Sequence, residues 1–271
     1  MESDLPQPDR DRLSVLAALV LITYTLLRLV TLPTMATEFS FLGILFRFVL
    51  NTRLVMLTLA AGLTSAGAAW LMRSHPKADS KLSVLEHMVI PGLAALGLGS
   101  ILSRAPEGGT LWIGLAVTAV LLIALLSAEF VALDTEDPRY GMASLGLRFL
   151  AYLLLVGSLF ALRATGLRAA FAIPIVLVAT TAVAWRLLKL SLPQTSTWQY
   201  AALIGGIVAQ LAWALHYWPT PPIEGALILG LAAYVGVEMI QANLQQDISR
   251  SRAIELAVVA GVALAAILIF A

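Results

Sequence analysis

The sequence predicts an all-α integral membrane protein: a polytopic bundle of about nine transmembrane helices plus one short interfacial or re-entrant helix. The first observation is composition, since 60% of the 271 residues are hydrophobic and only 12% are charged. Soluble domains average roughly 45–50% apolar and about 25% charged residues. The second is that apolar stretches of about 20 residues, enough to cross about 30 Å of hydrocarbon, recur along the chain. The third is that ten-residue segments of alternating hydrophobicity, the mark of a membrane barrel, are missing.

Nine apolar stretches are separated by short segments rich in Pro, Gly and charge, where helices end. They cover residues 13–32, 54–72, 84–102, 110–133, 143–162, 168–188, 197–217, 222–242 and 253–271. We therefore predict a single membrane domain over residues 1–271. Its parts are a cytoplasmic N-terminus (1–12), the first span (13–33), spans two to five (53–163) and spans six to nine (167–271).

Two segments near the N-terminus do not follow the pattern of long apolar spans. Residues 1–12 mix acidic and basic side chains, unlike the positive start of a secretory signal, so we expect the first span to be retained. The apolar segment 39–50 is too short to cross a bilayer and contains Arg47. We predict that 39–50 forms an interfacial or re-entrant helix.

The distribution of Lys and Arg predicts the orientation, because cytoplasmic loops carry an excess of both. With the N-terminus inside, ten of them lie on the cytoplasmic side and five on the external side. The inside set is Arg10, Arg12, Arg73, Lys77, Lys81, Arg139, Arg186, Lys189, Arg250 and Arg252, and the outside set is Arg47, Arg53, Arg104, Arg163 and Arg168. We expect a multi-pass protein of the cell membrane, the cytoplasmic membrane of a bacterium, with a cytoplasmic N-terminus and an external C-terminus.

Two pairs of segments predict an internal repeat. Arg53 and Trp70 bracket one span as Arg168 and Trp185 bracket another, 115 residues further on. Glu129 and Glu238 lie in similar segments 109 residues apart, each near the cytoplasmic end of its span. These correspondences predict a parallel four-plus-four repeat of spans two to five and six to nine. Internal repeats are common in transporters.

Ionisable side chains within the spans predict a binding site, because each costs about 2.5–3.5 kcal/mol at the centre of a membrane helix. Tyr234, Glu238 and Gln241 are spaced by four and three residues and share one helix face. We predict an intramembrane polar cluster that lines a cytoplasm-facing cavity. Its members are Glu238, Gln241, Arg148, Glu129 and Tyr234. For Glu129, within about a turn of its span end, contact with the interface remains an alternative, and His87 is expected to be interfacial.

No catalytic residue, metal site or cofactor is predicted. The chain has no Cys, which excludes thiolate ligands and Cys nucleophiles, and its three His residues are far apart in sequence. A basic surface for nucleic acid is absent, since the net charge is only +1. The expected partners are the lipid bilayer, a membrane-protein partner or a second copy, and an unknown small molecule or ion.

Three functions remain open at this level. The first is a transport-type bundle in which Glu238 binds a proton or cation and Arg148 or Glu129 tunes it. The second is a non-catalytic subunit or scaffold of a membrane complex, which suits a chain with so little mass outside the spans.

The third function is that of a membrane-embedded lipid- or prenyl-modifying enzyme. The loop from Asp134 to Arg139 in part resembles the Asp-rich Mg²⁺-diphosphate motifs of membrane prenyltransferases, with Asp247 near the place of a second motif. The chain departs from that family: no Asn-Asp pair opens the first motif, and Asp247 lacks acidic companions. Helix capping and turn formation explain Asp134 and Asp137 without a metal.

Overall fold

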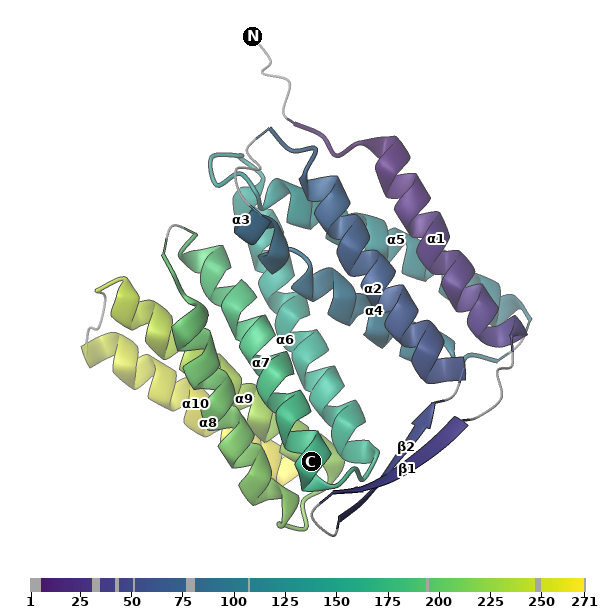
Figure 1. The fold of residues 1–271 in the computed structure, drawn as a ribbon. Helices are drawn as coiled ribbons and strands as arrows, with labels where there is room; N and C mark the ends of the chain where they lie inside the picture. Colours follow the sequence, from purple (N-terminus) through teal and green to yellow (C-terminus); the bar gives the residue numbers. More distant parts are fainter. Residues whose placement is uncertain are drawn as a thin grey trace. The chain divides into compact units, whose positions relative to one another are not determined.

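In the residues that the structure describes, the regular elements are helices and one β-hairpin (Figure 1). A computed structural model describes residues 6–30, 35–41, 44–50, 52–76, 81–106, 108–193, 195–246 and 250–270. It divides into two compact units, residues 1–143 and 144–271. The sequence did not predict this division.

The first unit is built around four long helices. In chain order it contains α1 (Arg10–Leu29), β1 (Met35–Phe41), β2 (Ile44–Leu50), α2 (Thr52–Met72), α3 (Lys81–Glu86), α4 (Val89–Leu102) and α5 (Gly109–Val131). The carboxylate of Asp9 starts α1 by accepting the Asp11 backbone N–H at 2.9 Å, which satisfies one of the unpaired donors of the first turn. Helix α1 packs on α2 and α5, and α4 packs on the same two helices, so the four form a closed bundle.

Close approach within this bundle depends on small residues. The ring of Tyr24 in α1 lies against Gly99 of α4, and its hydroxyl donates to the Ala95 carbonyl oxygen at 2.6 Å. A side chain at Gly99 would meet that ring. The core around it consists of buried apolar side chains such as Leu16, Val20 and Leu126.

A break separates α3 from α4 within the span that the sequence predicts at 84–102. Pro91, in the first turn of α4, has no N–H to donate to the His87 carbonyl and its ring crowds that carbonyl. The chain therefore turns at His87 and Met88, and Ser65 of α2 donates to the Met88 carbonyl oxygen at 3.2 Å. The break places His87 inside the bundle.

The expected interfacial or re-entrant helix at 39–50 is wrong. Residues 35–41 and 44–50 form an antiparallel hairpin, with Met35 opposite Leu50 and Phe41 opposite Ile44. The segment was judged by its apolar content, yet Phe and Val favour strands. Leu42 and Gly43 stand between the strands in the sequence, and a two-residue connection with Gly is typical of a hairpin.

Five helices make up the described part of the second unit. They are α6 (Tyr140–Ala164, which starts just before the boundary), α7 (Ala169–Ser191), α8 (Trp198–His216), α9 (Pro222–Leu244) and α10 (Arg250–Phe270). Helix α7 packs closely on α8 at Gly205, where an added Cβ would collide with the Thr181 hydroxyl. Helix α8 packs on α9, and α9 packs on α10.

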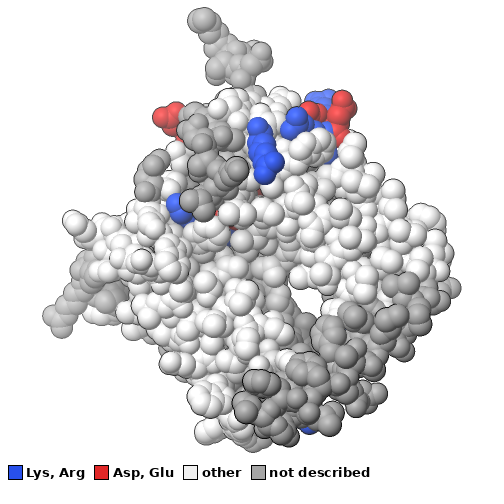
Figure 2. All heavy atoms as spheres, viewed as in Figure 1, with Lys and Arg blue, Asp and Glu red and all other residues white. Residues whose placement is uncertain are grey.

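Seven helices in the described part of the chain are long and apolar enough to cross a membrane: α2, the α3–α4 segment from Val84, and α5 to α9. Their outward faces are apolar as well, as in α5, where Trp112, Ile113 and Val120 are each about two-thirds exposed. Figure 2 shows a surface that is mostly uncharged, with its few charged side chains gathered chiefly near the start of α1. An apolar surface of this extent is typical of contact with lipid or with another membrane protein.

Candidate functional site

Helices α6 and α9 pack antiparallel, and three contacts define their register. The Tyr152 ring meets the Tyr234 ring, Val156 fills the space beside Gly230, and Arg163 lies over Gly225. Moving along α6 toward its N-terminus therefore means moving along α9 toward its C-terminus. Arg148, one turn before Tyr152, is level with Glu238, one turn after Tyr234.

This register brings two charged and two aromatic residues together inside the second unit. The rings of Tyr152 and Tyr234 lie edge to face, with centroids 5.6 Å apart and planes at 67°. Tyr152 interacts electrostatically with both Arg148 and Glu238. We call Arg148, Tyr152, Tyr234 and Glu238 the α6–α9 cluster.

Several donors and acceptors of the cluster form no hydrogen bond with other described residues. The Tyr152 hydroxyl oxygen is buried and has no hydrogen-bond partner among the described residues. Arg148 donates to the Ser191 hydroxyl of α7 at 2.7 Å. Within the described ranges, no hydrogen bond or ion pair involves the Glu238 carboxylate, although it interacts electrostatically with both tyrosines. Buried polar groups are normally hydrogen-bonded, so the Tyr152 hydroxyl is an exception within this unit.

The structure brings three of the five predicted site residues together: Arg148, Tyr234 and Glu238. Gln241 is buried on α9, one turn beyond Glu238. Glu129 belongs to the other unit. Tyr152 was left out of the predicted site, although it lies one turn after Arg148 on the same helix face and its spacing could have included it.

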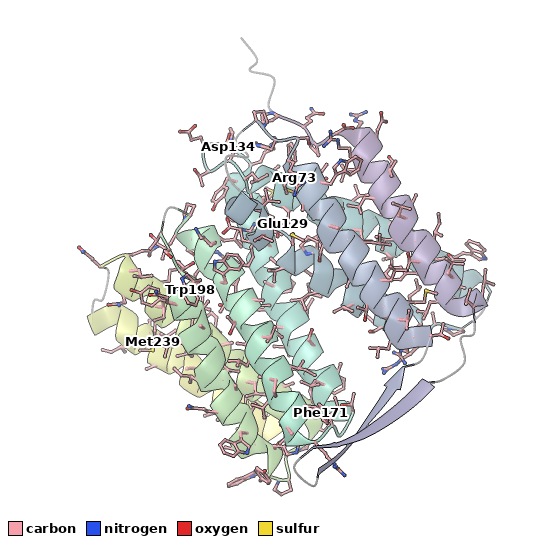
Figure 3. The ribbon with its side chains drawn as sticks, in the orientation of Figure 1. Arg73, Glu129, Asp134, Phe171, Trp198 and Met239 are labelled. Atoms are coloured by element: carbon pink, nitrogen blue, oxygen red, sulfur yellow. The ribbon has the colours of Figure 1, made fainter. Side chains whose placement is uncertain are left out.

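Glu129 takes part in a second polar cluster, inside the first unit. Its carboxylate oxygen Oε2 lies 2.7 Å from Nδ1 of His87, and both side chains are almost completely buried. The Glu86 carboxylate lies 3.8 Å from the other ring nitrogen of His87. Figure 3 places Glu129 among the helices, whereas Asp134 lies in the loop beyond α5. This His87–Glu129 pair sits in membrane-crossing segments, where an unpaired charge would be costly.

The side chain of His87 is only 3% exposed and contacts Glu129, so it faces the interior of the first unit, while its depth in the membrane stays a prediction. Pro91, four residues after His87, is the signal that marks the break.

The acidic loop after α5 is held by its own residues. Asp134 accepts the Glu136 backbone N–H at 2.9 Å. The carboxylate of Asp137 receives three hydrogen bonds from Arg139, two of them from the guanidinium at 3.0 and 2.7 Å. That guanidinium also donates to the Pro6 carbonyl oxygen at 3.0 Å. In the described part of the chain no group of His, Asp and Glu side chains is arranged to hold a metal ion, and Asp247 lies outside the described residues.

The Arg139 guanidinium lowers the pKa of Asp137, mainly through their side-chain hydrogen bond. A carboxyl whose pKa is lower in the folded protein adds stability above its ordinary pKa, and that stability disappears as the pH falls through the folded pKa. We expect Arg139→Gln to lower the melting temperature at neutral pH and to converge with the parent protein under acid conditions. Thermal unfolding in detergent over a pH series measures this, and a difference that grows toward low pH would contradict it.

The helices, their lengths and their apolar outer faces define a multi-pass membrane protein. Residues 32–270 match the family described as "Protein of unknown function (DUF5656)", and because this range covers most of the chain, the protein belongs to that family. Comparisons with curated proteins and with solved structures give no match.

Proposed function

We propose that the protein is a transport-type helix bundle of the cell membrane, in which the α6–α9 cluster binds the substrate and Glu238 binds a proton or cation. One observation carries the proposal. A carboxylate and a buried hydroxyl, neither with a hydrogen-bond partner among the described residues, lie on two membrane-crossing helices beside an arginine. Ionisable groups in such positions are expensive and mark substrate or ion pathways.

We propose nine spans, which adds α1 and α10 to the seven apolar helices. Both have a sufficient length, 20 and 21 residues, to cross the bilayer. We also propose a cytoplasmic N-terminus and an external C-terminus. Arg186 lies inside α7 and is only 1% exposed, so it does not count as a loop charge. The proposed cytoplasmic segments then carry nine Lys and Arg residues and the external segments five. The α6–α9 cluster then lies in the cytoplasmic half of its spans.

Matching contacts in the two units support an internal repeat. In the first unit, the Ser65 hydroxyl and the Ala61 carbonyl of α2 approach Gly92 of α4. In the second, Thr181 and Leu177 of α7 approach Gly205 of α8 in the same four-residue pattern. In the first unit the next helix, α5, packs on α4 and carries Glu129 near its C-terminal end. In the second unit the next helix, α9, packs on α8 and carries Glu238 near its C-terminal end. We propose that α2–α4–α5 and α7–α8–α9 are parallel copies.

Proton movement tests the proposed function. Proteoliposomes that contain a pH-sensitive dye are challenged with separate pools of amino acids, amines, organic acids and sugars. We expect at least one pool to change the internal pH, and Glu238→Gln to remove at least nine-tenths of that response. Glu224→Gln, at the opposite end of the same helix, is the matched control and should respond like the parent protein.

Two outcomes would contradict the proposal. One is an unchanged response in a correctly folded Glu238→Gln protein. The other is the absence of any response in the parent protein, combined with stoichiometric copurification of other membrane proteins, which would favour a subunit of a complex.

A further inference from the structure

We infer that the α6–α9 cluster recognises a small zwitterion, with the ligand's anionic group at Arg148 and its ammonium group at Glu238. The inference rests on the proposed function, since it names the substrate class of the same site. It starts from charge placement. Antiparallel packing of α6 and α9 puts a guanidinium and a carboxylate level with each other on facing helices.

The two charges do not neutralise each other directly. No ion pair within 4.0 Å joins Arg148 to Glu238 in the described ranges. Arg148 is instead directed to the Ser191 hydroxyl of α7 by a hydrogen bond of 2.7 Å. That bond uses only one of the five N–H donors of a guanidinium, so several remain for a carboxylate or phosphate.

The acidic side of the cluster is suited to an ammonium group. Glu238 and Glu255 of the neighbouring helix α10 both interact electrostatically with Tyr234. Two carboxylates beside an aromatic ring attract a cation, and an ammonium group also donates hydrogen bonds to a carboxylate and to a phenol oxygen.

The opposed charges select for ligands that carry both signs. A simple anion that binds Arg148 would approach Glu238 and Glu255 as like charges, and a simple cation at Glu238 would approach Arg148. In a low-dielectric site each such approach costs more than it would in water. A zwitterion satisfies both ends, and the Tyr152 hydroxyl, which has no hydrogen-bond partner in the described part of the chain, can bond to either end or to the atoms between them.

Binding to the purified, full-length protein in phosphatidylglycerol nanodiscs tests the inference. The probes are glycine, β-alanine, 4-aminobutyrate and 6-aminohexanoate, which separate the same two charges by increasing distances. Butyrate and butylamine carry one charge each. We expect one amino acid of the series to bind at least tenfold more tightly than either singly charged compound.

Variants identify the groups that bind. Arg148→Gln and Glu238→Gln should each weaken binding of the preferred amino acid at least tenfold, while Glu224→Gln should not. In Arg148→Gln the preference should shift toward butylamine, an outcome that simple misfolding would not produce. Thermal unfolding without ligand establishes that each variant is folded.

Changing the nanodisc lipid distinguishes a soluble zwitterion from a lipid headgroup as the natural ligand. Replacing phosphatidylglycerol with phosphatidylethanolamine, whose headgroup has the same two charges, should displace the bound amino acid if the natural ligand is a lipid headgroup. It should leave binding unchanged if the natural ligand is a soluble zwitterion.

The outcomes separate this inference from the proposed function. If butyrate or butylamine binds as tightly as every amino acid of the series, the ligand class is wrong. Proton movement that still depends on Glu238 would then leave the proposed function standing. If no probe binds and no pool moves protons, both fail.

Discussion

Replacing Glu129 with leucine is expected to destabilise the first unit by about 3–5 kcal/mol, the usual cost of removing one partner from a buried pair. Glu129 and His87 are joined at 2.7 Å, with almost no exposure to solvent. Loss of the carboxylate leaves the His87 imidazole without its 2.7 Å partner in an apolar bundle. Reversible unfolding in mixed detergent, followed by circular dichroism, measures the difference.

Two further variants distinguish a pair effect from a simple packing defect. Glu129→Gln keeps an oxygen that can accept from Nδ1 and should lose less than half as much stability. The double variant His87→Leu, Glu129→Leu removes both polar partners, so it should be more stable than the sum of the single losses predicts. Additive losses would show that the two residues stabilise the bundle independently.

The Gly205→Val substitution is expected to destabilise the second unit by about 1–3 kcal/mol relative to Gly206→Val. At position 205 a Cβ would collide with the Thr181 hydroxyl and lie 3.0 Å from the Leu177 carbonyl oxygen, whereas nothing lies within 4 Å at position 206. Both substitutions change helix propensity by the same amount, so their difference isolates the α7–α8 contact. Equal losses at the two positions would contradict the close packing of these helices.

The helical segments were predictable because lipid allows few alternatives. Long apolar stretches must become helices, whose backbone groups are satisfied internally, and Pro and Gly between them end those helices. Segments such as 110–133 and 222–242 therefore lie within one or two residues of α5 and α9.

The hairpin at 35–50 was missed because the same argument fails for short segments. An apolar run of this length is ambiguous between helix and strand, and only its Phe and Val content with a central Gly favours the strands. The break at His87 was missed for a related reason. Pro91 lies inside an apolar stretch, and a hydropathy profile does not register that a proline removes a backbone N–H donor.

The sequence named three members of the α6–α9 cluster, missed Tyr152, and could not give the register of the two helices. Spacing on α9 placed Tyr234 and Glu238 on one face, whereas Arg148 was selected because it is an ionisable residue within a predicted span. Which residues face each other depends on Val156 packing at Gly230 and Arg163 over Gly225, contacts between distant segments that no local pattern encodes. Glu129 was selected by charge alone, and its partner His87 comes from a different helix.

Cysteine accessibility tests the central claim, a membrane bundle whose α6–α9 cluster opens to the cytoplasm. The chain has no Cys, so a single introduced thiol reports its own position. Glu238→Cys is compared with Met239→Cys, the next residue on α9, which Figure 3 labels and which is 59% exposed on an apolar face. With a charged, membrane-impermeant maleimide, we predict labelling at position 238 in inverted vesicles only, and at position 239 in neither orientation. Labelling at 238 only from the external side, or at 238 and 239 equally, would contradict the account.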